Sequence, residues 1–246
     1  MRLGLIHRPV PRLPRLAAVL AALPAPPEAC NWHALIHLDG DPLGNDGHAN
    51  CVECAALRAL QMMRTAVAGD RRKPTAGEAR ALYRDWAGWD GTQASDIGTA
   101  SDAAAEHWGR GGIAWGPWFE DIPAIGSLDA ANTLHLKGAI ATLGPVQLDL
   151  ALPLAWQNAI VWSESGGPEG VPGSWGAHRV AAGRYDARFL YVVTWGEERA
   201  IPWDALARYA LDACATATRS WLDAEGRSPG GLSYDALRRQ MTELAA

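Results

Sequence analysis

The sequence predicts an α+β protein, with a mainly helical N-terminal half followed by a mainly β half. Three observations predict this class. Residues 31–110 contain several apolar stripes with helical spacing, the chain after Pro117 shows the alternating pattern of strands, and the pair Gly144-Pro145 ends a short helix just before the first clear strand. A chain of 246 residues is long enough for one domain or for two lobes that share a cleft.

The longest helical pattern begins at Cys51. Apolar residues follow it at the spacing of a helix buried on one side, from Val52 to Val67, whereas the preceding residues 44–50 form a polar, glycine-containing loop. A cysteine at a helix start meets unpaired backbone N–H groups and the positive end of the helix dipole, which stabilise a thiolate. Cys51 is therefore a candidate nucleophile, and the side-chain amide of Asn45 is a candidate donor to an oxyanion.

Two further helices are expected before residue 110. Thr75 and Glu78 form a capping-box pattern, which predicts a helix over 75–87. Ser101 is expected to cap another helix that reaches Trp108.

The elements of the second half follow from similar signals. A helix is expected over 131–143, followed by Val146–Leu150 as a half-buried strand and by strands over 177–182 and 189–195. The remaining expectations are a helix from Pro202 to about Thr218 and a closing helix capped by Ser233.

Composition argues against several classes of function. The 22 basic and 27 acidic residues give a net charge of −5, and the basic residues are scattered, so no nucleic-acid partner is expected. No stretch has the roughly 20 apolar residues of a membrane span. The apolar run Leu16–Leu23 follows four arginines like a signal peptide, but prolines surround it, which favours a proline-rich arm and a location other than secreted. The 4 cysteines are expected as free thiols, and no cofactor is expected.

The order of motifs along the chain carries a resemblance. After Asn45 and Cys51 come Gly144-Pro145-Val146, Trp156-Gln157, Trp175-Gly176-Ala177-His178 and Trp195-Gly196. Over roughly residues 31–200 this order resembles the papain-like cysteine peptidase family. The resemblance implies a two-lobed fold, with a helical N-terminal lobe, an antiparallel β C-terminal lobe and the site in the cleft between them.

The same resemblance implies roles for individual residues. Cys51 matches the nucleophile, His178 the base and Asn45 the oxyanion-hole amide, while Trp175 and Trp195 match residues of the cleft wall. A peptide or another amide is then the expected substrate, and a thioester acyl-enzyme is the expected intermediate.

One position departs from the family. Val193 stands where these peptidases have the Asn that orients the catalytic imidazole. Because a valine side chain accepts no hydrogen bond, either Thr194 or Asp149 is expected to hold His178, or the site works as a bare Cys–His dyad, or it has no activity.

A second resemblance is to uncharacterised papain-like proteins of phages and bacteria. It rests on Asp96-Ile97-Gly98, on Val192–Gly196 and on Ser228–Gly231. It keeps open a different hypothesis, in which the chain is an inactive papain-like scaffold that binds an assembly partner, for example in a phage particle. The implied location is cytoplasmic or virion-associated.

The resemblance also implies a division of the chain. Residues 1–30 form the arm, 31–125 the helical lobe with the nucleophile, 126–200 the β lobe with the base, and 201–246 a set of helices that cover the body. The arm is similar to a short pro-segment and, like one, is able to lie over the cleft.

The cysteines allow two other interpretations. Cys51-Val52-Glu53-Cys54 at a helix start has the form of a thiol–disulfide redox motif, but that fold requires a strand directly before the helix, and a polar loop precedes this one. His48, Cys51 and Cys54 are three possible zinc ligands without a fourth at a recognisable spacing, so no metal site is expected.

Overall fold

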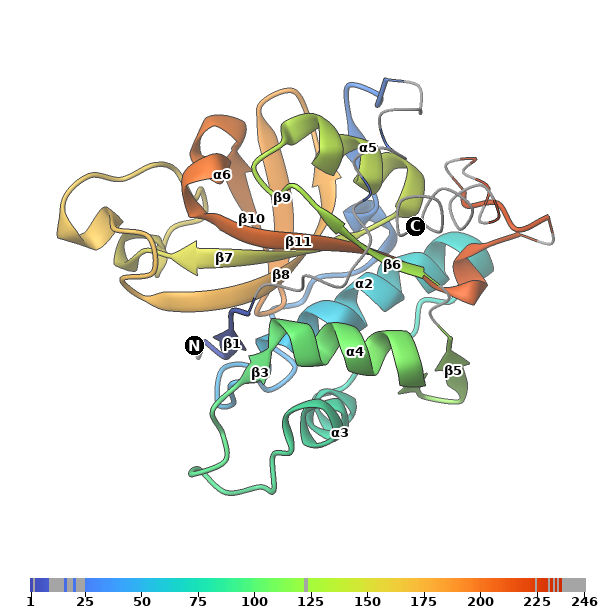
Figure 1. Cartoon of the computed structure of the whole chain (residues 1–246), viewed down its shortest axis with the longest axis horizontal. Coiled ribbons are helices and arrows are strands. Elements are labelled where there is room, and N and C mark those ends of the chain that lie inside the picture. The colour runs from blue at the N-terminus through green and yellow to red at the C-terminus, as the bar shows by residue number, and fades with distance from the viewer. Residues whose placement is uncertain are drawn as a thin grey trace, which may run out of the picture.

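The computed structural model describes residues 1, 3–8, 16, 20, 25–121, 124–223, 225–229, 231, 233 and 235. Its central feature is helix α2 (Cys51–Ala68), which lies against an antiparallel sheet (Figure 1). Helices α3 (Ala76–Ala87) and α4 (Ser101–Gly111) lie on the same side of the sheet as α2. The helical half and the β half that the sequence predicts are therefore both present.

Seven strands of the described residues form the main sheet, in the order β10-β9-β8-β7-β11-β6, with β2 paired to β8. All these pairings are antiparallel. The strands are β2 (Cys30–Asn31), β6 (Ala124–Leu128), β7 (Val146–Leu152), β8 (Gly176–Tyr185), β9 (Phe189–Thr194), β10 (Glu197–Pro202) and β11 (Ala210–Ala217).

Shorter elements complete the fold. Helix α5 (Thr133–Leu143) covers the face of the sheet away from α2, and α6 (Trp203–Tyr209) joins β10 to β11 (Figure 1). Two pairs of short strands lie outside the main sheet: β1 (Leu5–Ile6) with β3 (Thr99–Ala100), and β4 (Ile113–Trp115) with β5 (Trp118–Glu120). The 3₁₀ helices are η1 (His33–Leu35), η2 (Leu154–Trp156), η3 (Pro168–Gly170) and η4 (Arg219–Trp221).

The start of α3 confirms the predicted capping box. The Thr75 side chain accepts the Glu78 backbone N–H, and the Glu78 carboxylate accepts the Thr75 backbone N–H. The expected cap at Ser101 is wrong, because Ser101 is the first residue of α4 and its hydroxyl donates to Asp149 instead.

The sheet corrects two more predictions. The helix expected up to Thr218 ends at Tyr209, and residues 210–217 form strand β11 between β7 and β6. β7 was expected to be half-buried, but all seven of its residues are buried because α2 and α5 cover its two faces. The closing helix expected after Ser233 lies almost entirely outside the described residues. Among the described residues, no helix has the length and apolar character that a bilayer crossing requires.

β8 lies directly against α2. The two elements come so close that a Cβ on Gly183 of β8 would lie 2.8 Å from the sulfur of Met62. One apolar cluster fills the sheet side, with Val180, and a second surrounds α2, with Cys51. The close approach holds the second half of α2 against β8.

A buried ion pair lies beside this contact. Asp149 of β7 faces Arg179 of β8 in the strand register, and its carboxylate oxygens lie 2.5 Å from Nε and 2.8 Å from Nη2 of the guanidinium. Ser101 of α4 donates to the same carboxylate at 3.0 Å. The three groups join two strands to a helix, and a charge left here without its partner is costly.

We expect Asp149→Ala to lower the free energy of unfolding by about 3–5 kcal/mol, because it leaves the Arg179 cation buried and unpaired. Urea unfolding followed by tryptophan fluorescence measures this loss. The exposed pair Arg219–Asp121 provides the control, since Asp121→Ala should cost less than about 1 kcal/mol. Equal losses in the two variants would contradict the structural role of the buried pair.

Candidate active site

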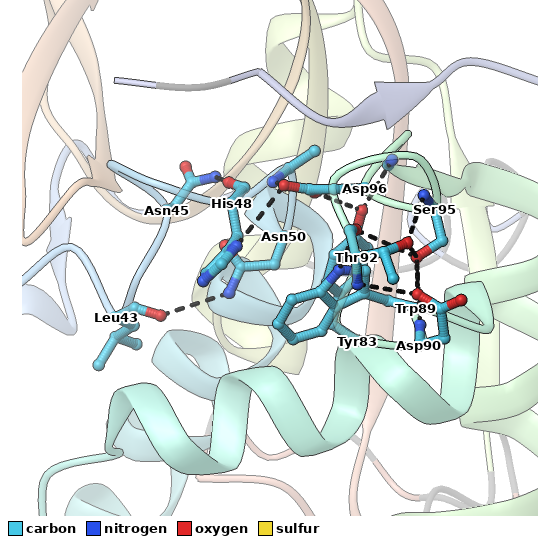
Figure 2. Close-up of polar contacts among 12 residues, drawn as sticks. Leu43, Asn45, His48, Asn50, Tyr83, Trp89, Asp90, Thr92, Ser95 and Asp96 are labelled. Atoms are coloured by element: carbon cyan, nitrogen blue, oxygen red, sulfur yellow. Dashed lines mark hydrogen bonds and ion pairs between the residues drawn. The ribbon is translucent and has the colours of Figure 1, made fainter.

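Cys51 is the first residue of α2 and is 1% exposed. The preceding residue, Asn50, makes no side-chain cap; its amide turns away and donates to the Leu43 carbonyl at 3.3 Å (Figure 2). The first backbone N–H groups of an α-helix have no partner within the helix. Here Asn50 leaves them uncapped, which suits the binding of an anion beside Cys51.

The Cys51 sulfur has two backbone donors from distant parts of the chain. They are the N–H groups of Arg179 in β8 and of Gly4 near the N-terminus. Burial raises the pKa of the Cys51 thiol to about 12, and these two donors oppose that rise only in part. The thiol is therefore neutral at physiological pH in the described arrangement.

His178 is fully buried on β8. Its Nε2 lies 2.7 Å from the Thr194 hydroxyl, and its ring stacks on Trp195 with a centroid distance of 4.4 Å and an interplanar angle of 19°. Among the described residues, its Nδ1 has no hydrogen-bond partner, so no hydrogen bond joins His178 to Cys51 here. Burial lowers the pKa of His178 to about 3, which keeps the imidazole neutral.

Most of the predicted site residues line one small cavity. It has a volume of about 10 Å³, room for roughly one water molecule, and Asn45, Cys51, Thr194 and Trp195 contribute to its wall. His178 is not part of that wall. It is joined to the cavity through its hydrogen bond with Thr194.

The two candidate orienters behave differently. The Thr194 hydroxyl contacts His178, whereas both carboxylate oxygens of Asp149 bond to Arg179. Successive side chains of a strand point to opposite faces, so Arg179 and its partner Asp149 lie on the face of β8 away from His178. The interpretation of Asp149 as an orienter is therefore corrected. Val193 is buried and supplies only hydrocarbon to the cavity wall.

Asn45 is 1% exposed and its amide is anchored. Its Nδ2 donates to the His48 carbonyl at 2.9 Å, which occupies one of its two N–H groups (Figure 2). Because Asn45 also borders the Cys51 cavity, the side chain is held next to the sulfur and not in solvent.

Trp175 and Trp195 pack against each other beside His178. The next residue, Gly196, accounts for the glycine of the Trp-Gly motif. The Trp175 and Trp195 rings lie 5.5 Å apart at 31°, with Trp195 against His178. Trp195 has a φ of 50°, a strained value for a bulky residue. Gly196 has a φ of 76°, and a Cβ there would collide with the backbone at Asp41. Only glycine fits this close approach.

The N-terminal strand covers the site. The Gly4 carbonyl accepts the Thr99 N–H at 2.8 Å, and β1 pairs with β3 in parallel, Leu5 with Thr99 and Ile6 with Ala100. Leu5 is buried in the same apolar cluster as Cys51. A side chain at Gly4 would collide with the Ala49 carbonyl, so only a glycine allows the strand to lie so close to the start of α2.

Sequence reasoning missed several residues of this site. Arg179 and Gly4 act through their backbone N–H groups, which no side-chain motif reveals. Side chains alternate between the two faces of the strand that contains His178, and this alternation is the sequence signal that places Arg179 on the face towards α2. Glu53, one turn into α2, is fully buried, and one of its carboxylate oxygens accepts the Thr99 hydroxyl at 2.6 Å.

The alternative interpretations of the cysteines find no support. Among the described residues, no three or more His, Cys, Asp or Glu side chains are arranged to hold a metal ion. All four cysteines are free thiols, and Cys54 contacts the Pro42 and Leu43 carbonyls at 3.7 Å. The segment before α2 is a loop and not a strand, which also disagrees with a thioredoxin-type redox motif.

The comparisons with known proteins agree with the architecture. Neither a protein family model nor a curated protein sequence matches the chain. Among solved structures, the chain is similar to xylellain, a cysteine protease from Xylella fastidiosa, with a TM-score of 0.63 and 15% identity over 88% of this chain and 96% of that one. The chain has a papain-like fold.

Two other structures with this fold are also similar. Procathepsin B S9 from Trypanosoma congolense has a TM-score of 0.64 and 10% identity over 89% of this chain and 87% of that one. Bromelain from Ananas comosus, in complex with E64, has a TM-score of 0.57 and 14% identity over 78% of this chain and 99% of that one. At these identities the papain-like fold is what is shared.

The buried carboxyl group of Glu53 provides a pH-dependent test of burial at the start of α2. Burial raises the pKa of Glu53 from 4.5 to about 7, so between these values the folded state binds more protons than the unfolded chain. The stabilisation by this group is therefore complete below about pH 4.5 and is lost as the pH rises through 7.

We expect Glu53→Gln to raise the free energy of unfolding at pH 8 by roughly 3 kcal/mol and to change it little at pH 4, because glutamine does not ionise. Urea titrations at the two pH values measure the difference. A gain of the same size at both pH values would show that ionisation of Glu53 is not its cause.

Proposed function

We propose that the protein is a cysteine-dependent hydrolase, a peptidase or amidase that acts through a thioester on Cys51. The observation that supports this best is the position of the chain's own N-terminus. An extended backbone segment lies over Cys51, with Gly4 hydrogen-bonded to Thr99 and the Ile6 carbonyl 3.5 Å from the Ser101 hydroxyl. We infer that the space filled by this segment is the substrate groove, because an extended backbone is the form that a bound peptide substrate takes.

The orientation of this segment explains why it is not itself a substrate in the described state. The backbone N–H of Gly4 lies beside the Cys51 sulfur, and the carbonyl oxygen of Gly4 accepts the Thr99 N–H. A donor stabilises the sulfur but offers it no electrophile. The segment therefore acts as an occupant of the groove, and an incoming substrate must displace it.

Displacement also changes the electrostatics in the direction that catalysis needs. Burial is the main cause of both the raised pKa of Cys51 and the lowered pKa of His178. When the segment leaves and water enters, the pKa of the thiol falls and that of the imidazole rises. A thiolate–imidazolium pair then becomes accessible, with the uncapped start of α2 favouring the anion.

The proposed reaction uses these groups in turn. In the described arrangement His178 lies on the face of β8 opposite to Arg179 and its Nδ1 has no hydrogen-bond partner, so the proposed reaction requires the ring to move to Cys51 when the segment leaves; Nδ1 then accepts the thiol proton. The sulfur attacks the amide carbon, and the oxyanion accepts hydrogen bonds from the Cys51 backbone N–H and from Asn45. His178 then protonates the leaving amine. Water, deprotonated by His178, hydrolyses the thioester and restores the thiol.

Gly4→Ala tests whether the segment blocks the site. Because the added Cβ collides with the Ala49 carbonyl, the strand cannot keep its position, and we expect iodoacetamide to alkylate Cys51 roughly 10-fold faster or more. Peptide mapping by mass spectrometry gives the rate at each cysteine. The matched control is Gly166→Ala, where an added Cβ meets nothing within 4 Å. Unchanged alkylation in Gly4→Ala would contradict the blocking role.

The hydrolase proposal is tested with a library of fluorogenic peptides and the Gly4→Ala chain. We expect turnover that Cys51→Ala abolishes, that His178→Ala lowers by roughly 10²–10⁴-fold, and that Thr194→Val lowers by roughly 10-fold through loss of one hydrogen bond. If no peptide is cleaved and Cys51 is alkylated no faster than Cys54, the protein is instead a papain-like scaffold that binds a partner without turnover.

A further inference from the structure

The loop before the nucleophile is held by a carboxylate from another part of the chain. Asp96 lies in the segment between α3 and β3 and is 5% exposed. Its Oδ1 accepts the Ala49 backbone N–H at 2.8 Å and the Tyr83 hydroxyl at 2.9 Å (Figure 2). Ala49 lies two residues before Cys51, so the carboxylate acts directly on the turn that leads into α2.

The other oxygen of Asp96 extends the contact toward the oxyanion amide. Oδ2 lies 3.5 Å from Nδ1 of His48, and the His48 ring lies against Trp89 with a centroid distance of 4.7 Å. The carbonyl of His48 is the acceptor that anchors Asn45. Asp96 is thus linked through one residue to the side chain that is proposed to bind the oxyanion.

Tyr83 connects Asp96 to Gly98, which lies at the edge of the inferred groove. Its hydroxyl donates to Asp96 and accepts the Gly98 backbone N–H at 2.9 Å. The next residue, Thr99, is the one that bonds the N-terminal segment. A Cβ on Gly98 would collide with the Gly4 carbonyl, so this edge lies very close to whatever backbone occupies the groove.

We propose that Asp96 is a positioning residue for the oxyanion hole and for the groove edge. It holds the turn before Cys51 through Ala49, it holds Asn45 through His48, and with Tyr83 it sets the place of Gly98. This proposal rests on the hydrolase function proposed above. It gives a role to a motif, Asp96-Ile97-Gly98, that the proposed reaction does not use.

The proposal separates two reactions of the same sulfur. Alkylation by iodoacetamide displaces iodide from carbon and forms no oxyanion, whereas a peptide aldehyde adds the sulfur to its carbonyl and leaves an oxyanion that needs the donors near Cys51. Loss of the positioning contact should therefore weaken aldehyde binding and leave alkylation unaffected.

The test uses Asp96→Asn, with Asp90→Asn as its matched control. Asp90 is an exposed carboxylate in the same segment, and among the residues that the structure describes its hydrogen bonds are to its neighbours Thr92 and Ser95 (Figure 2). Each substitution is made in the full chain and in its Gly4→Ala variant. The readouts are the inhibition constant of a peptide aldehyde, the kcat and KM of a cleaved peptide, and the alkylation rate of Cys51.

For Asp96→Asn we expect a roughly 10-fold or greater rise in the aldehyde inhibition constant and a kcat lower by roughly 10–100-fold, with the alkylation rate within about twofold. Asp90→Asn should change none of these. Tyr83→Phe, which removes the hydroxyl that donates to Oδ1, should weaken aldehyde binding by a smaller factor, and it provides the test if Asp96→Asn does not fold.

Two results would overturn the positioning role. The first is unchanged aldehyde binding in Asp96→Asn, or in Tyr83→Phe if only that variant folds. The second is an equal loss of alkylation and of aldehyde binding, which would indicate general loosening of the loop. If the parent chain neither binds the aldehyde nor cleaves a peptide, the hydrolase function itself fails and the positioning role fails with it. The parent chain therefore distinguishes the two failures.

Discussion

The contact between the first turn of α2 and strand β8 determines most of what this site is able to do. The backbone N–H of Arg179 lies beside the Cys51 sulfur at the first turn, and further along the helix Gly183 allows the strand to approach Met62 closely. The Asp149–Arg179 pair lies at the same junction and joins β7, β8 and, through Ser101, α4. Cys51 is thus held by backbone contacts between elements that are distant in the chain.

This junction is buried, and burial sets the charge state. Cys51 and His178 are both buried, and burial shifts their pKa values in opposite directions, so the neutral thiol and the neutral imidazole are the stable forms. The N-terminal strand contributes to this state because Gly4 lies on the sulfur and Leu5 joins the apolar cluster. In the proposed account, a resting state with neutral groups changes to a reactive one when water and substrate replace the strand.

Local patterns predicted much of the fold. The one-sided apolar stripe after Cys51 predicted α2, the Thr75–Glu78 pair predicted the start of α3, and Gly144-Pro145 marked the entrance to β7, because each signal depends on residues close in sequence. The strand β11 was missed because Ala210–Ala217 is rich in alanine, and only its two neighbours in the sheet make it a strand.

The site was only partly predictable for the same reason. The order of motifs pointed to Cys51, Asn45 and Thr194, which border one cavity. The partner of Asp149, the amide of Gly4 on the sulfur and the contact of Asp96 with Ala49 all join residues far apart in the chain. Pairing of this kind depends on strand register and on tertiary contacts, and a single sequence does not encode it in any local pattern.

The central claim is that Cys51 forms a thioester with a peptide acyl group. Acid quenching of the Gly4→Ala chain during reaction with a short peptide ester, followed by peptide mapping with mass spectrometry, measures this directly. The account predicts an acyl group on Cys51 that is absent when Cys51→Ala is added and that forms more slowly when His178→Ala is added. Acylation at Cys54 or elsewhere, or no acylated cysteine while the ester is consumed, would contradict it.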